Sequence, residues 1–147
     1  MSELKAISIK QPWLDLILRG EKKLELRGWN PAFRGSIALH SPMKIDFHAA
    51  HYFGYTEPWK LERGKVLGMA NLTSVTELNE KSYTETLIEH LSVQPFAGMI
   101  YAIGFSDIFV LPKPVAAKGK LLLFILEEEI SEKIINQLPH NNNFHQI

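Results

Sequence analysis

Apolar and polar positions in the first third of the chain follow two different periods. Alternation with the period of a half-buried strand occurs in residues 4–10, 23–27 and 35–41. Between the first two of these segments, residues 13–20 place apolar side chains on one helical face. Pro12 precedes that face and suits the first turn of a helix, where its missing N–H costs nothing. The pattern predicts a strand, a helix and two further strands, in that order.

The rest of the chain alternates between β-forming and helix-forming segments. Strands are predicted at residues 64–78, 98–111 and 119–129, and helices at residues 43–55, 80–91 and 130–138. Pro112 and Pro114 are expected to end the second of these strands, since proline cannot donate to a sheet ladder. The segment 139–147 has little to bury, so we expect one domain over 1–138 followed by a disordered tail.

This order of elements is not the regular alternation of a doubly wound sheet. It predicts an α+β fold, a small β-barrel of five to six strands with flanking helices. One contiguous core is expected to contain the apolar strand residues Ile7, Ile9, Leu24, Leu26, Ile37, Leu39, Val66, Ile100, Ile103, Leu122 and Phe124.

Composition narrows the possible functions. The 147 residues are 46% hydrophobic and 22% charged, typical of one soluble globular domain. Lys+Arg 16 and Asp+Glu 16 balance, so any electrostatic recognition must be local. The absence of cysteine excludes disulfides, thiolate metal sites and a cysteine nucleophile. The sequence has no apolar run long enough to span a membrane and no signal peptide, and we expect a cytoplasmic protein without a cofactor or membrane partner.

Charge is concentrated in one part of this neutral chain. Residues 10–35 contain six basic and three acidic side chains. If Leu24 and Leu26 face the core, Glu25 and Arg27 share the opposite face, with Trp29 just beyond. One interpretation is a solvated strand face with weak ion pairs. The other is a cleft for phosphate groups and bases, since guanidinium and ammonium groups beside an aromatic ring suit both.

Other candidate groups give weaker signals. A second basic cluster, Lys113, Lys118 and Lys120, surrounds a loop marked by proline and glycine, which is a solvated loop or a further anion-binding segment. The histidines His40, His48 and His51 do not complete a metal-binding pattern, so no metal site is predicted. His40 lies at a strand end near the proposed cleft. Ser36, Ser41 and Thr73 do not lie in a nucleophile elbow.

The segment 7–42 closely resembles the opening of the ASCH (ASC-1 homology) domain family, whose fold is similar to that of PUA domains. The resemblance rests on Gln11-Pro12-Trp13, on a GxKxxExR pattern beginning at Gly20, and on Trp29 and Arg34-Gly35. It continues more weakly to about residue 128. The QPW version looks closest to the branch containing the carboxy-terminal domain of the coactivator ASC-1. The resemblance implies a β-barrel with a cleft and an RNA-linked role.

Two functions remain open. The first is a module that binds RNA, another single-stranded nucleic acid or a modified nucleoside, through Lys10, Gln11, Trp13, Lys22, Arg27, Trp29, Arg34 and Lys118. The second is a hydrolase acting on a nucleoside or RNA, with Lys22 and Glu25 as catalytic residues. Small bacterial members of the family hydrolyse N4-acetylcytidine with a lysine, a threonine and a glutamate. Lys22 matches that lysine, whereas Glu25 stands at the threonine position. A protein partner is a further possibility.

Overall fold

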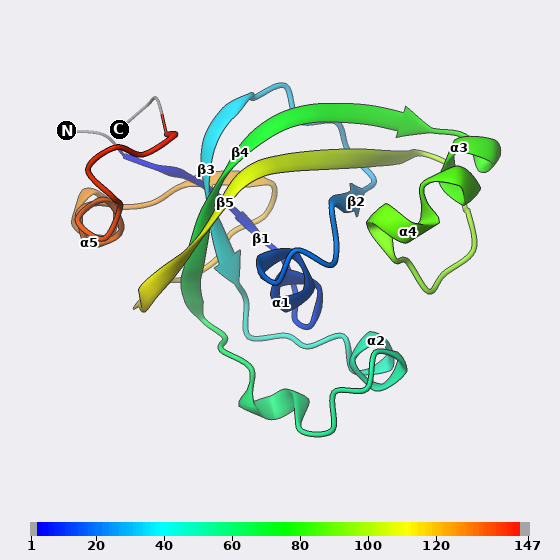
Figure 1. The fold of residues 1–147 in the computed structure, drawn as a ribbon, viewed down its shortest axis with the longest axis horizontal. Coiled ribbons are helices and arrows are strands. Elements are labelled where there is room, and N and C mark those ends of the chain that lie inside the picture. The colour runs from blue at the N-terminus through cyan, green and yellow to red at the C-terminus, as the bar shows by residue number, and fades with distance from the viewer. Residues whose placement is uncertain (1–2, 145–147) are drawn as a thin grey trace.

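A long, curved pair of antiparallel strands organises the molecule (Figure 1). In the computed structural model, which describes residues 3–144, these strands are β4 (Lys65–Leu78) and β5 (Ile100–Ala116). The other strands are β1 (Lys5–Ser8), β2 (Leu24–Arg27), β3 (Gly35–Ser41) and β6 (Leu123–Ile125). They form one sheet in the order β2-β5-β4-β3-β1-β6, in which β1 and β3 are parallel and the other neighbours antiparallel. The predicted α+β class is confirmed.

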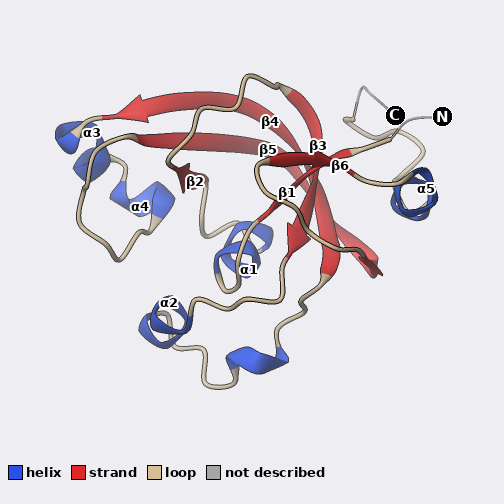
Figure 2. Ribbon diagram, turned by 180° about the vertical axis from the view of Figure 1, so that it is seen from behind, coloured by secondary structure: helices blue, strands red, loops and turns tan. Residues whose placement is uncertain are grey.

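The helices are short and lie around this sheet (Figure 2). They are α1 (Trp13–Leu18), α2 (Phe47–Tyr52), the 3-10 turn η1 (Pro58–Lys60), α3 (Glu80–Glu85), α4 (Leu87–His90) and α5 (Glu128–Ile135). The predicted helix 43–55 is therefore reduced to its centre, and the predicted helix 80–91 is divided in two. A capping box between Asn79 and Ser82 starts α3, and left-handed Leu91 ends α4. Within residues 3–144 no helix has the length and apolar character needed to cross a membrane.

The six strands form one open sheet, which is not closed into the small barrel that we predicted. Its edges are β2 and β6, which do not pair with each other. Register shifts along β4 and β5 curve the sheet, but the edge strands contain only four and three residues. Side chains of α1, including Leu14 and Ile17, pack against the strand residues Ile7, Ile37 and Ile103 on one face of the sheet. Helix α1 therefore covers part of the sheet face that would line the interior of a closed barrel.

Alternation along the strands divides the core between the two faces of the sheet. Ile7 and Leu39 join the cluster around α1, whereas their neighbours Ala6 and Ala38 join a second cluster with Ile134 of α5. A third, smaller cluster surrounds Tyr83 of α3. The single contiguous core that we predicted is thus three clusters. Leu122 belongs to none of them, because it is 56% exposed in the loop before β6.

Strand β5 continues through both prolines that were expected to end it. Its register with β4 changes from Gly68↔Val110 to Val66↔Val115, which leaves residues 111–114 in a bulge. Pro112 and Pro114 therefore lie where no ladder hydrogen bond is lost. Between them, the main-chain N–H and carbonyl of Lys113 both bond to the side-chain amide of Gln137, at 2.8 and 2.9 Å.

The carboxy-terminal segment packs against the domain as far as the structure describes it. Asn143 donates to the carboxylate of Asp107, and Phe144 is 5% exposed within the cluster around α5. The disordered tail expected at 139–147 therefore includes described residues with tertiary contacts, and residues 145–147 lie outside the described part.

Candidate functional site

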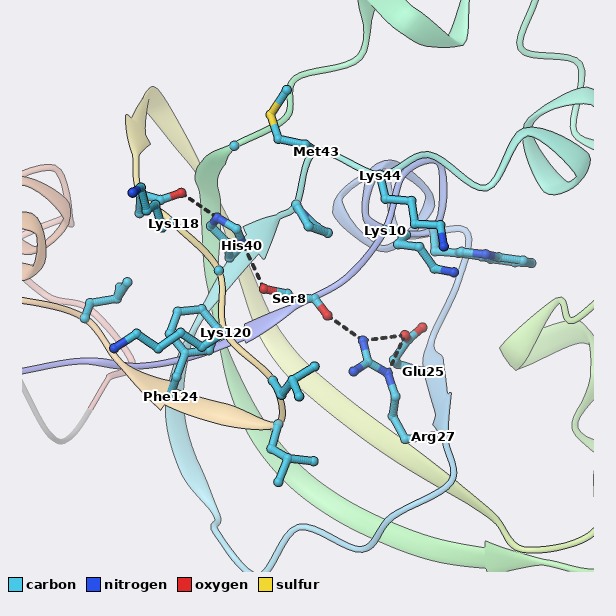
Figure 3. Close-up of a pocket in the computed structure, with 18 of the residues that line it drawn as sticks. Ser8, Lys10, Glu25, Arg27, His40, Met43, Lys44, Lys118, Lys120 and Phe124 are labelled. Atoms are coloured by element: carbon cyan, nitrogen blue, oxygen red, sulfur yellow. Dashed lines mark hydrogen bonds and ion pairs between the residues drawn. The ribbon is translucent and has the colours of Figure 1, made fainter.

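A large pocket lies on the open side of the sheet, between the two edge strands (Figure 3). Its volume is about 1930 Å³, and β2, β6, the end of β1 and the loop after β5 contribute to its lining. The ionisable lining residues are Lys10, Lys22, Glu25, Arg27, His40, Lys44, Asp46, Lys118, Lys120 and Glu127. Leaving out the histidine, six of these side chains are basic and three are acidic.

Glu25 is the centre of a buried ion network on β2. Its side chain is 10% exposed and accepts from the Nε of Arg27 at 3.0 Å, while the Nζ of Lys22 lies 3.6 Å from its other oxygen. Arg27 also donates from Nη2 to the main-chain carbonyl of Ser8 at 2.6 Å. The alternation of the KLELR segment explains this arrangement, because it directs Glu25 and Arg27 to the same face. Two cations therefore share one carboxylate in the pocket wall.

Lys22 lines the pocket and is almost fully buried. Its side chain is 3% exposed, and its Nζ donates to the carbonyl oxygen of His90 at 2.5 Å. The same Nζ lies 4.8 Å from the ring centroid of Trp13, at a distance typical of cation–π contacts. Burial lowers the pKa of Lys22 below its ordinary value, although the charge of Glu25 opposes this shift. The ammonium group therefore already contacts a carbonyl oxygen, a carboxylate and an aromatic ring of the protein.

Two tryptophans line the pocket in different ways. The Nε1 of Trp13 donates to Asp46 at 3.0 Å, and its ring meets Phe53 edge-on. Burial tends to raise the pKa of Asp46, but hydrogen bonds from Ala49 and Trp13 and the charge of Lys10 hold it below its usual value. Trp29 is half-buried against the α1 cluster and also lines the pocket. Within residues 3–144, no hydrogen bond or ring contact of this kind is found for Trp29.

A serine and a histidine form a hydrogen-bonded pair in the same pocket. Ser8 and His40 are register partners on the parallel strands β1 and β3, and the Oγ of Ser8 lies 2.8 Å from the Nδ1 of His40. The Nε2 of His40 lies 2.7 Å from the carbonyl oxygen of Ala117. Burial lowers the pKa of His40, and the hydrogen bond to Ala117 only partly offsets this. Burial therefore favours the neutral imidazole.

Most of the residues proposed from the sequence are brought together in this pocket. Those that line it are Lys10, Trp13, Lys22, Glu25, Arg27, Trp29 and Lys118. Gln11 and Arg34 do not line it. The side chain of Gln11 is buried and bonds to the N–H of Asp15 and the carbonyl of Glu62. Arg34 is exposed and donates to the carbonyls of Pro31 and Phe33.

Ser8, Lys44 and Asp46 were not predicted from the sequence to lie in the site. His40 was predicted only to lie near the cleft, and Lys120 only to belong to a basic loop. Lys44 and Asp46 lie within a segment that was predicted to be helical. In the structure the chain is extended there, and Ile45 forms an isolated parallel β-bridge with Gln11. His48 and His51 are exposed on α2 and do not line the pocket. No group of three or more His, Asp or Glu side chains suited to a metal ion occurs in the described residues.

Comparison with solved structures places this arrangement in a known fold. A crystal structure of an ASCH protein from Zymomonas mobilis matches with a TM-score of 0.64 over 90% of this chain and 93% of that chain, at 16% sequence identity. A single-substitution variant of the same protein matches with a TM-score of 0.65 over 92% of this chain and 98% of that chain, at 15% identity. At this level of identity the likeness shows the fold.

The sequence comparisons give the family. No curated protein matches the sequence. The model of the ASCH domain matches residues 7–135, which include the ion network on β2, the Ser8–His40 pair and the loop that covers them. The chain therefore belongs to the ASCH domain family.

Proposed function

We propose that this chain is a nucleic-acid-binding module that takes RNA or a modified nucleoside in a positively charged cleft, the pocket between β2 and β6. Membership of the ASCH family, which is generally considered RNA-binding, supports this proposal. The pocket volume of about 1930 Å³ supports it too, because it exceeds the several hundred Å³ of an ordinary small-molecule site.

The observation that carries the proposal is the set of lysines that the protein leaves without an acidic partner at the pocket. Lys44, Lys118 and Lys120 are exposed, and no ion pair is found for them among residues 3–144. Unpaired ammonium groups are available to phosphate oxygens, whereas Lys22 and Arg27 are held by Glu25. We therefore assign the phosphate contacts to the three exposed lysines together with Lys10, and a structural role to the network around Glu25.

Stacking on Trp29 is the second part of the proposal. One face of Trp13 is already occupied by the ammonium of Lys22. Trp29 lies in the loop after β2 and packs only partly against the α1 cluster. An aromatic ring at the edge of a basic groove offers a base the combination of contacts that sequence-tolerant single-strand binding uses.

The test is the salt dependence of RNA binding. We expect a fluorescently labelled single-stranded RNA to bind with an affinity that falls as salt rises, by about 0.7 counterion for each phosphate contact. Lys118→Ala and Lys120→Ala should each flatten the slope by nearly one contact. Lys81→Ala is the matched control, because Lys81 is an exposed lysine on α3 away from the pocket. No binding, or equal slopes for all variants, would contradict the proposal.

A second candidate function is a hydrolase acting on a nucleoside or RNA, with Lys22 and Glu25 as the catalytic pair. The lowered pKa of the buried Lys22 beside Glu25 favours it, since perturbed groups in a pocket are typical of active sites. The test is release of acetate from N4-acetylcytidine. We expect none, because Glu25 replaces the threonine; turnover that Lys22→Ala abolishes would favour the hydrolase instead.

Two finer assignments also remain proposals. On the Gln11-Pro12-Trp13 motif we place the chain in the branch that contains the carboxy-terminal domain of ASC-1. A cytoplasmic location and a possible protein partner are predictions from the sequence.

A further inference from the structure

The Ser8–His40 pair has a defined direction of proton donation. The carbonyl oxygen of Ala117 can only accept, so the Nε2 of His40 must carry the proton that joins them at 2.7 Å. In the neutral imidazole, Nδ1 then has a lone pair and no proton. The 2.8 Å contact is therefore a hydrogen bond donated by the Ser8 hydroxyl to Nδ1.

This arrangement contains the three parts of an activated serine. The hydroxyl is the nucleophile, the neutral imidazole is a base within hydrogen-bond reach, and the Ala117 carbonyl fixes the tautomer and orientation of the ring. His40 is 1% exposed, and its ring meets Phe124 edge-on at 5.9 Å between centroids. The base is therefore held rigidly, whereas Ser8 is half-buried and lines the pocket.

The surroundings of Ser8 favour an ester as the substrate. Phe124 of β6 lies beside His40 (Figure 3). Leu122 and Ile125 also line the pocket, and together these side chains give an apolar lining that suits an acyl chain. Lys118 and Lys120 flank Gly119 on the covering loop, and their charge would favour the negative oxygen that forms when a carbonyl is attacked. Gly119 itself lies so close that a Cβ there would be 2.6 Å from the Oγ of Ser8.

We propose that Ser8 and His40 are the nucleophile and general base of a carboxylic-ester hydrolase site, an activity separate from nucleic-acid binding. The Oγ of Ser8 forms a bond to the ester carbonyl carbon as its proton passes to Nδ1 of His40. The bond to the alkoxy group then breaks, and the leaving oxygen takes that proton. Water next attacks the acyl-serine and gives its proton to Nδ1. The carboxylic acid leaves, the proton returns to Oγ, and both residues are restored.

A unique thiol tests the base directly. The chain has no cysteine, so the Ser8→Cys variant contains a single thiol. Alkylation of that variant by iodoacetamide therefore reports on this one position. An ordinary thiol has a pKa of about 8.5, burial alone raises it, and an adjacent imidazole base lowers it. We expect the Ser8→Cys thiol to titrate at least one pH unit below the thiol of Thr76→Cys, an exposed position on β4. An equal or higher value overturns the proposal.

The nearby lysines could lower the thiol pKa without any contribution from His40. The Lys118→Ala/Lys120→Ala changes, added to Ser8→Cys, remove these two exposed charges and leave the buried histidine intact. The low thiol pKa should persist, and its return to that of the Thr76→Cys thiol overturns the assignment to His40.

The wild-type protein provides the test of the serine. Diisopropyl fluorophosphate should form one adduct on Ser8, as Oγ bonds to phosphorus, fluoride leaves and His40 takes the hydroxyl proton. Peptide mapping should find that adduct in the wild type and not in Ser8→Ala. Hydrolysis of 4-nitrophenyl acetate should fall at least tenfold in Ser8→Ala. Absence of the adduct, or equal hydrolysis by both proteins, overturns the proposal and leaves the nucleic-acid assignment untouched.

Discussion

The guanidinium of Arg27 on β2 donates to the main-chain carbonyl of Ser8 on β1, although these two strands do not pair. The same guanidinium bonds to Glu25. A single side chain therefore spans the open side of the sheet, where a closed barrel would have backbone hydrogen bonds. It also links the ion network of β2 to the Ser8–His40 pair.

Replacing Arg27 should have a larger effect on the stability of the fold than on nucleic-acid binding. Hydrogen bonds to charged groups contribute about 1.5–3 kcal/mol, so we expect Arg27→Ala to lower the free energy of unfolding by about 2–3 kcal/mol in urea titrations. The salt slope of RNA binding should stay unchanged. Arg34→Ala is the control, because Arg34 is exposed and, among residues 3–144, its side chain bonds to the nearby loop carbonyls of Pro31 and Phe33. Equal losses for the two variants would contradict a bridging role.

Glu25→Gln should be among the most destabilising single changes in the pocket. It leaves the charges of Lys22 and Arg27 beside each other without the carboxylate that now compensates both. Breaking a buried ion pair costs about 3–5 kcal/mol, and chemical denaturation would measure the loss. Glu62→Gln, which removes the exposed partner of Lys65, should cost less than about 1 kcal/mol. A similar effect for both would show that the Glu25 network is not a buried one.

Stability should fall in mild acid because of two buried histidines. Burial lowers the pKa values of His40 and His90 below the ordinary 6.5. The unfolded chain then binds more protons than the folded one below about pH 6.5, so the free energy of unfolding falls from there to the lowered folded-state pKa values. Above pH 6.5 these groups contribute no slope. Thermal melting between pH 8 and 5 would show this, and a melting temperature that rises on acidification would contradict it.

Gly119→Ala should disturb the covering loop. The added Cβ would lie 2.6 Å from the Oγ of Ser8 and 2.7 Å from the Cε1 of His40, closer than such contacts occur. Overpacking of this kind costs about 1–3 kcal/mol. Gly28→Ala is the matched control, because its Cβ would meet its nearest neighbour, the carbonyl oxygen of Met99, at 3.8 Å. If the two variants melt at the same temperature, the loop is not packed against the pair.

Trp29→Ala should weaken RNA binding without changing its salt dependence. Stacking contributes about 1–3 kcal/mol per base and neutralises no phosphate, so the affinity should drop while the slope stays the same. Trp59→Ala removes a tryptophan that is 57% exposed on η1 and does not line the pocket, and it should leave binding unchanged. A smaller slope for Trp29→Ala, or equal losses for both, would contradict stacking.

Local patterns predicted those parts of the structure that depend on neighbouring residues. Alternation in residues 23–27 indicated that Glu25 and Arg27 share a face, and both line the pocket. The Ser8–His40 pair could not be found in this way, because the two residues are 32 positions apart in the chain and meet only through the parallel register of β1 and β3. Whether the sheet closes could not be predicted from the sequence either, because closure depends on how many residues of each edge strand are available to pair across the opening.

The bulge in β5 limits the addition of a further strand along this stretch of the sheet. An exposed strand edge offers N–H and carbonyl groups to which another chain can add a strand. Pro112 and Pro114 have no N–H, and Gln137 occupies both main-chain groups of Lys113 between them. Residues 112–114 therefore present no N–H to a further strand, and two molecules cannot extend their sheets through this stretch.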